Sequence, residues 1–314
     1  MSIVVLGAVF VDVKGYPTAT YIPGGRNTGN VEQVHGGVSR NIVEDIANLE
    51  LRPRFVSLVD HSALGTEVIE KLKNHKVDTR FMKRTDDGMG TWLAIFDNDG
   101  DVVAAISKRP DLTPIADILD EKGDEIFRDA DSALLEIDMD TDIVKRVMKY
   151  AEKYHFPVYA AISNMSIAAK RRDLLQSVDC VVCNKQEAGI LFSEDYDDKT
   201  ADEMQQIIAE KIKLARIPCM VVTMGVDGSV YADLQGNMGL CPAKRVAAKD
   251  TTGAGDAFFA GCAAGLTYHK SLAESCEIGT RMAASVITSL ENVIPRFLPE
   301  EFGLPGESKD ESNE

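Results

Sequence analysis

Short runs rich in β-branched residues alternate with amphipathic helical patterns along most of this chain. From about residue 36 onward, this alternation predicts βαβ units, in which a helix connects each pair of parallel strands. We therefore expect an α/β fold with a doubly wound, mainly parallel central sheet flanked by helices. The expected strands are residues 2–11, 54–59, 133–137, 157–161, 179–183, 219–223 and 228–233, and the expected helices are residues 38–49, 62–75, 141–154, 166–175, 200–215, 255–268 and 271–289.

Two segments interrupt this alternation. Residues 13–35 contain several glycines and prolines among β-branched and aromatic residues, and residues 89–107 carry a hairpin signal at Asp97–Gly100. Together they predict a small β lid above the sheet, although each could also be a surface excursion with no shared role. The expected division is an α/β core of residues 1–12, 36–88 and 108–303, a lid of residues 13–35 and 89–107, and a disordered acidic tail of residues 304–314.

Charge limits the classes of partner. The chain has 34 basic and 50 acidic residues, a formal net charge of −16, which argues against a nucleic-acid or anionic-membrane surface. The apolar start, Met1–Asp12, lacks a basic leader and ends in an acid, so it predicts a buried strand and not a signal peptide. No apolar run reaches membrane-spanning length. We expect a soluble, cytoplasmic protein with neither a nucleic-acid nor a membrane partner.

The six cysteines all lie in apolar stretches of the C-terminal half and are expected to be reduced core thiols. Cys180 and Cys183 have the spacing of a metal-binding pair. No second pair and no histidine cluster accompanies them, so core packing is favoured over a zinc or redox role.

The run Asp250–Gly261 joins a glycine turn to the start of a helix. Gly253 and Gly255 permit backbone angles closed to other residues, so the amides of residues 253–256, Ala254 included, can form a concave nest for an anion. The helix adds its positive N-terminal end at the same place. A carboxylate beside this nest, Asp256, would repel a phosphate, which indicates a chemical role. The alternative is that Asp256 is only a favourable acid in a first helical turn.

Two further motifs suit a phosphate-transfer site. Gly36 and Gly37 open a helix and let a ligand approach the backbone, while Asn41, one turn later, offers a donor and an acceptor. Asn184 and Glu187 follow a buried strand, at the edge where open α/β sheets bind ligands, and could order Mg²⁺ waters and phosphate oxygens. The alternatives are a plain glycine turn for the first motif and a helix cap for the second.

A third motif is a strand that feeds a glycine turn and contains Thr223, Gly225 and Gly228. It suits either an adenine nucleotide or a simple hairpin. The chain has no Gly-x-x-x-x-Gly-Lys-Ser/Thr motif and no Gly-x-Gly-x-x-Gly after its first strand. Two common phosphate-binding schemes, including that of nicotinamide-dependent oxidoreductases, are thus excluded by motif.

In their order along the chain, these elements resemble the ribokinase-like, or PfkB, family of sugar and nucleoside kinases over roughly residues 1–300. The resemblance implies that Asp256 accepts the proton of the substrate hydroxyl while the amides of Gly253, Ala254 and Gly255 stabilise the moving phosphoryl group. It also implies that the sugar is bound by Asp12, at the end of the first strand, together with Gly36, Gly37 and Asn41. Mg²⁺ and phosphate are assigned to Asn184 and Glu187. ATP is assigned to Thr223, Gly225 and Gly228.

Many members of this family also bind a monovalent cation near the counterparts of Asp250 and Thr252. The complementary segment here, Thr288–Asn292, lacks the usual glycine, which weakens the case for potassium. Lid sheets in the family often pair between subunits, which favours a homodimer through the lid. The alternative is that the exposed β edges are covered in another way.

Within the family, Gly36–Asn41 followed by Glu44, together with the glycine-rich residues 23–29, is most similar to pseudouridine kinases. Tyr159–Asn164 departs from the pattern, because many relatives have an acid at that strand end. The expected reaction is ATP- and Mg²⁺-dependent phosphorylation of a primary hydroxyl on a ribosyl compound, with pseudouridine as the first candidate and ribose, fructose or a purine nucleoside as alternatives. A nucleotide sensor without turnover would show an eroded anion turn or no Asp256, and neither is the case.

Overall fold

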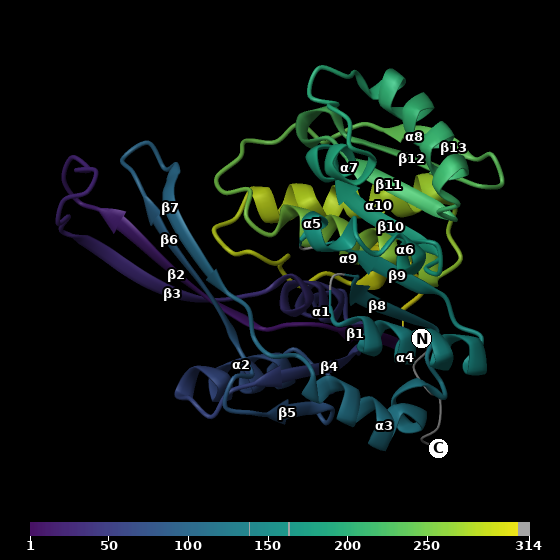
Figure 1. Ribbon diagram of the computed structural model, residues 1–314, viewed down its shortest axis with the longest axis horizontal. Helices are drawn as coiled ribbons and strands as arrows, with labels where there is room; N and C mark the ends of the chain where they lie inside the picture. Colours follow the sequence, from purple (N-terminus) through teal and green to yellow (C-terminus); the bar gives the residue numbers. More distant parts are fainter. Residues whose placement is uncertain (138, 163, 307–314) are drawn as a thin grey trace.

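The computed structural model describes residues 1–137, 139–162 and 164–306 (Figure 1). Within these residues the core is a nine-stranded sheet in the order β13-β12-β11-β10-β9-β8-β1-β4-β5. All neighbouring strands are parallel except at β12 and β13, which pair antiparallel. The predicted mainly parallel α/β sheet is therefore confirmed.

Both faces of this sheet are buried. In β1, Ile3 and Val5 enter one hydrophobic cluster while Val4 and Leu6 enter the other, as the two-residue period of a strand requires. The core strands are β1 Ile3–Leu6, β4 Arg54–Val59, β5 Met82–Arg84, β8 Ser132–Glu136, β9 Val158–Ala161, β10 Cys180–Asn184, β11 Cys219–Thr223, β12 Ser229–Asp233 and β13 Met238–Cys241.

Helices cover the two faces as separate groups. Apolar residues of the first group pack with Ile3 and Val5, and those of the second group pack with Val4 and Leu6. The first group is α1 Val38–Asn48, α2 Ala63–Asn74, α9 Ala254–Thr267 and α10 Leu272–Ile287. The second is α3 Pro114–Phe127, α4 Thr141–Tyr154, α5 Met165–Ala168, α6 Arg172–Leu175, α7 Lys185–Phe192 and α8 Ala201–Ala215.

A second, four-stranded sheet projects from the core (Figure 1). Its order is β3-β2-β6-β7, with β2 and β6 parallel and the outer pairs antiparallel, so it joins the two segments that interrupt the α/β alternation. We call this sheet the lid. Its strands are β2 Phe10–Pro17, β3 Gly29–Gly36, β6 Gly90–Phe96 and β7 Val102–Lys108.

Strand register divides the lid into two faces. Asp12 is the partner of Trp92, and Lys14 is the partner of Ala94, so these side chains share one face, called the inner face below. The opposite, outer face carries three apolar side chains that are exposed to solvent: Val31, Leu93 and Ile106.

The predicted strand 2–11 is wrong in its extent, because the chain leaves the core sheet after Leu6 and enters the lid at Phe10. The break occurs at Gly7, where φ is +154°. A Cβ there would overlap the hydroxyl of Ser39 and lie 2.6 Å from Glu136 Oε1. Asp12 consequently lies within a lid strand and not at the end of the first core strand.

Other boundaries also differ. The helix expected over residues 166–175 is two short helices, α5 and α6, because Arg171 leaves the helical region with φ −122° and ψ 48°. Helices α3 and α7 and strands β5 and β13 were not among the expected elements, although Pro114 at the first turn of α3 is a helix-start signal.

The packed core extends to the first residue of the predicted tail, because Leu304 is 1% exposed. Residues 307–314, the rest of that tail beyond Gly306, lie outside the described residues. Among the described residues, no helix is both long and apolar enough to cross a membrane.

Candidate active site

The anion turn, Thr251–Asp256, leads into α9. Gly253 precedes this helix with φ +81° and supplies no side-chain cap. The Ala254 amide donates to the Thr251 carbonyl at 3.2 Å, while the amides that follow it in the first turn of α9 have no capping side chain and can face an external anion. A Cβ at Gly255 would meet nothing within 4 Å, so the turn opens onto free space at the position expected for a transferring phosphoryl group.

Asp256 lies in the first turn of α9 and accepts a hydrogen bond from Asn41 Nδ2 at 2.6 Å. Its surface is partly accessible, yet protein atoms surround the carboxylate, and this burial raises the pKa of Asp256 to about 7. The Asn41 hydrogen bond and the charge of Arg40 lower it, while Glu136 and Asp12 raise it further. A carboxyl group that titrates near neutrality is well matched to accepting a proton.

The substrate turn, Gly36–Gly37, joins β3 to α1. Gly37 has φ +101°, and a Cβ there would lie 2.8 Å from the carbonyl oxygen of Ala8. A Cβ on Gly36 would lie 2.5 Å from the carboxylate of Asp12. The two glycines thus allow Asp12 to reach the start of α1, where Asn41 contacts Asp256. Burial raises the pKa of Asp12, against the opposing charges of Lys14 and Arg40.

Glu136, at the carboxyl end of β8, is a site residue that the sequence patterns did not indicate. Its side chain accepts hydrogen bonds from Ser39 Oγ at 2.6 Å and from the amides of Ser39 and Ala8 at 3.3 Å. It therefore fixes the first turn of α1, from which Asn41 projects. No local motif surrounds it, and its only sequence signal is an acid at the end of an apolar strand.

Asn184 and Thr223 are register partners at the carboxyl ends of β10 and β11. Asn184 and Glu187 form a reciprocal capping box, with both hydrogen bonds at 2.8 Å, so the helix-cap interpretation of this motif holds. Gly225 and Gly228 follow Thr223 with φ +58° and +90°, and a Cβ at Gly225 would face open space. This edge forms a second polar region of the site.

The predicted cation ligands form a local turn, in which the Thr252 amide donates to Asp250 Oδ1 at 2.8 Å. Burial of Asp250 is outweighed by hydrogen bonds from Thr252, so the pKa of this carboxyl is lowered. Among the described residues, no group of three or more His, Cys, Asp or Glu side chains could hold a metal ion. A potassium site here stays a prediction.

The cysteine interpretation is supported by strand geometry. All six thiols are free and buried. Cys180 belongs to the cluster on one face of the sheet and Cys183 to the cluster on the other. Three residues apart on a strand, they point to opposite faces and cannot chelate one metal ion.

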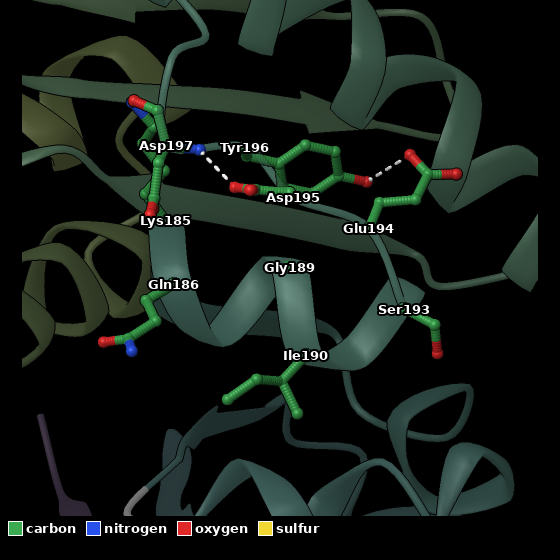
Figure 2. A pocket seen from close by; sticks show the side chains of 9 residues that line it. All are labelled: Lys185, Gln186, Gly189, Ile190, Ser193, Glu194, Asp195, Tyr196 and Asp197. Atoms are coloured by element: carbon green, nitrogen blue, oxygen red, sulfur yellow. Dashed lines mark hydrogen bonds between the residues drawn. The ribbon is translucent and has the colours of Figure 1, made fainter.

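A hollow of about 390 Å³ lies beside α7 and is lined by Lys185, Gln186 and the segment Ser193–Asp197 (Figure 2). None of its lining residues is among the predicted catalytic or binding residues. The Lys185 ammonium donates to the carbonyls of Asp197 and Lys199, so it supports this loop.

The comparisons with known proteins agree with this geometry. The family model described as pfkB family carbohydrate kinase matches residues 1–295. The chain belongs to this family. It is 32% identical to a guanosine-inosine kinase of Exiguobacterium acetylicum over 95% of this chain and 98% of that protein. It is 25% identical to the pseudouridine kinase of Escherichia coli over 92% of this chain and 96% of that protein.

Solved structures give the same fold. The structure of Arabidopsis thaliana ribokinase complexed with ribose and ATP superposes with a TM-score of 0.79, 20% identity and coverage of 96% of this chain and 97% of that one. By its family match and its 32% identical relative, the protein is a PfkB carbohydrate or nucleoside kinase, a phosphotransferase of a family that uses ATP.

Replacing Asp256 with asparagine should lower kcat by a factor on the order of 10² to 10⁴, because a positioned proton acceptor is lost while the turn remains. Affinity for a non-hydrolysable ATP analogue, measured by calorimetry, should change little. At pH 8 the variant should unfold at no lower temperature than the wild type, since a buried charge is removed. Retention of most of kcat, or an equal loss of nucleotide affinity, would contradict the assigned role.

The raised pKa of Asp256 also predicts a pH profile. A base must be deprotonated, so kcat/KM should rise about tenfold per pH unit below pH 7 and level off above it. Asn41 donates to the charged form, so Asn41→Ala should move the midpoint to higher pH. A value of kcat/KM that does not change between pH 5.5 and 8 would contradict the role of Asp256 as the proton acceptor.

Proposed function

We propose that this kinase transfers the γ-phosphoryl group of ATP to the 5′-hydroxyl of a ribonucleoside, with guanosine or inosine as the preferred substrate. The observation that carries this proposal is the position of Trp92 beside Asp12 on the inner face of the lid. The 32% identity to a guanosine-inosine kinase supports it, and the 25% identity to a pseudouridine kinase makes the substrate expected from the sequence the second candidate.

The inner face of the lid is directed toward the anion turn. Tyr16 lies on it, and the pKa of Tyr16 is raised first by burial and then by the charges of Glu32 and Asp250. The ring of Tyr16 stacks on Phe96 with centroids 4.8 Å apart, and Phe96 meets Trp92 edge-on at 6.5 Å. An aromatic surface therefore continues outward from the polar group of Asp12.

A ribonucleoside has polar and aromatic groups that match the polar and aromatic parts of this surface. Its ribose hydroxyls would bind Asp12 and Asn41, and its base, attached to the same ring, would stack on Trp92. Aromatic stacking suits any base, but a purine covers more of the indole than a pyrimidine. A free sugar would leave this surface without a partner.

In the proposed mechanism, the substrate oxygen attacks the γ-phosphorus, the bond to the β–γ bridging oxygen breaks, and the hydroxyl proton passes to the Asp256 carboxylate. The products are a nucleoside 5′-monophosphate and ADP. The amides of Gly253, Ala254 and Gly255 stabilise charge on the moving phosphoryl group. Thr223, Gly225 and Gly228 would line the nucleotide side.

Asn184 and Glu187 offer amide and carboxylate oxygens at the edge of the sheet, a donor set that fits Mg²⁺ with water and phosphate as its other ligands. A bound Mg²⁺ would neutralise phosphate charge. The homodimer through the lid stays a prediction. Val31, Leu93 and Ile106, exposed on the outer face, are consistent with it.

Substrate choice can be tested by comparing kcat/KM for guanosine, inosine, pseudouridine, ribose and fructose. We expect the purine nucleosides to lead. Trp92→Ala should reduce kcat/KM for guanosine by about 5- to 150-fold, which corresponds to the loss of one base–aromatic stacking contact. The kcat/KM for ribose should stay unchanged. Thr91→Ala, which changes the preceding residue on the outer face and is not one of the expected dimer contacts, is the matched control. A lead for free ribose or fructose would overturn the proposal, and a lead for pseudouridine would select the second candidate.

The metal assignment gives a separate expectation. Glu187→Gln should raise the Mg²⁺ concentration for half-maximal rate severalfold and leave nucleoside KM nearly unchanged. Glu274→Gln makes the same change in the capping box of α10, whose N-terminus lies at the opposite end of the α9–α10 pair from the anion turn. If both variants lose similar stability and neither shifts the Mg²⁺ dependence, Glu187 is only a cap.

A further inference from the structure

The loop that follows α10 is in direct contact with the anion turn. A Cβ added at Gly253 would overlap the carbonyl oxygen of Asn292 and lie 3.0 Å from its Cα. Gly253 is also held at φ +81°, immediately before the first residue of α9. The position of the Asn292 backbone therefore sets where the anion turn can lie.

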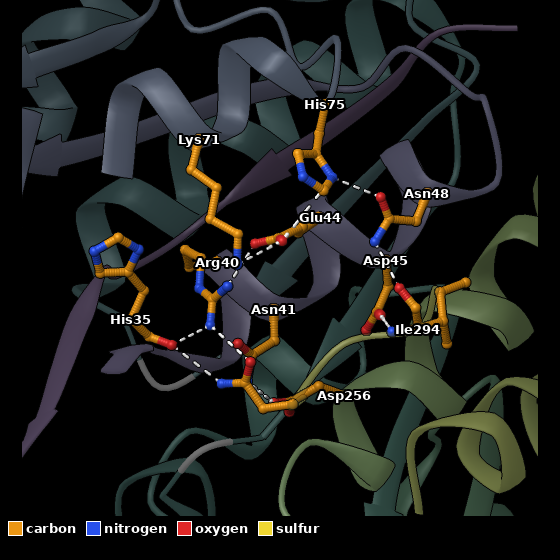
Figure 3. Close-up of polar contacts among 11 residues, drawn as sticks. His35, Arg40, Asn41, Glu44, Asp45, Asn48, Lys71, His75, Asp256 and Ile294 are labelled. Atoms are coloured by element: carbon orange, nitrogen blue, oxygen red, sulfur yellow. Dashed lines mark hydrogen bonds and ion pairs between the residues drawn. The ribbon is translucent and has the colours of Figure 1, made fainter. Parts of the chain in front are cut away.

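The side chain of Asn292 uses both ends of its amide. Asn292 Nδ2 donates to the carbonyl oxygen of His35 at 3.1 Å, and Asn292 Oδ1 accepts from Arg40 Nη2 at 3.3 Å. Arg40 Nη2 also donates to the same His35 carbonyl (Figure 3). His35 immediately precedes Gly36 and Gly37, so Asn292 connects the substrate turn to the anion turn.

Arg40 is held rigidly in turn. Its side chain is 1% exposed, and Nη1 pairs with Glu44 Oε2 at 2.5 Å. The other oxygen of Glu44 lies 2.9 Å from Lys71 Nζ of α2 (Figure 3). Burial of Glu44 is outweighed by the charges of Arg40 and Lys71, so its pKa is lowered and the carboxylate stays charged. The planar guanidinium is therefore fixed in one orientation.

We propose that Asn292 is a positioning residue for phosphoryl transfer, which together with Arg40 clamps the anion turn at a fixed distance from the substrate turn. Asn292 does not contact the reacting atoms in this proposal. It acts through Gly253 on one side and through the His35 carbonyl on the other. Because phosphoryl transfer depends on alignment, a displacement of about 1 Å between the two turns can cost on the order of 10² in rate.

The test is a comparison of Asn292→Ala with Asn292→Gln, assayed with Mg·ATP and whichever substrate the wild-type enzyme turns over fastest. The alanine variant should lose about 10- to 100-fold in kcat, with nucleoside KM changed less than about threefold. The glutamine variant keeps both an acceptor for Arg40 and a donor for the His35 carbonyl, and it should recover a substantial part of kcat. Glu291→Ala, an exposed change in the same loop, is the control and should behave as the wild type.

Thermal unfolding separates positioning from stability. If Asn292→Ala unfolds at a lower temperature but has wild-type kcat well below that temperature, the role is structural and the proposal fails. It also fails if KM rises while kcat is unchanged, or if Asn292→Gln, folded, is as slow as the alanine variant. A low kcat of folded Asn292→Ala with rescue by glutamine supports it.

Discussion

The hydrogen bond between Asn41 and Asp256 joins residues 215 positions apart and brings the first turns of α1 and α9 together. Each of these helices begins at a glycine with positive φ, and neither has a side-chain cap. Two positive helix ends therefore converge on one place, and the glycines before them leave room for a ligand. The rest of the site is arranged around this pair, because Glu136 fixes the start of α1 and Asn292 lies against the start of α9.

Bringing these elements together also places several carboxyl groups close to one another, and their negative charges repel. Asp12, Asp45, Glu136 and Asp256 gather near one another in a chain that already carries a net charge of −16. Burial raises the pKa of Asp45 well above its usual range, and its Oδ1 accepts a hydrogen bond from the Ile294 amide at 2.7 Å. The buried Arg40 opposes the charge on Asp45 and on Asp256. A buried arginine whose charge acts on Asp12, Asp45 and Asp256 is thus a condition for the site, and not only a packing element.

The sequence predicted the parts of the site that depend on local backbone chemistry. The glycine turn before α9, the glycine pair before α1 and the polar residues at the ends of β10 and β11 all lie where their patterns indicated. The residues that were missed act through contacts distant in sequence. Glu136 reaches Ser39 across 97 positions, and Asn292 reaches His35 across 257, so no short motif can contain them. The break at Gly7 has the same origin, since it is Ser39 and Glu136 that exclude a side chain there.

The lid carries one half of the proposed substrate site, and its orientation depends on how it meets the core. Glycines mark this junction: a Cβ at Gly90 would overlap the ring of Phe10, and one at Gly37 would lie 2.9 Å from the Phe10 amide. They are constrained by close contacts and are not free hinges. Any side chain there would push β2 away from α1, and the carboxylate of Asp12 would move away from Asn41. Glycines at this junction therefore have two effects. They let the chain cross from the core to the lid, and they keep Asp12 of the lid close to Asn41 of the core.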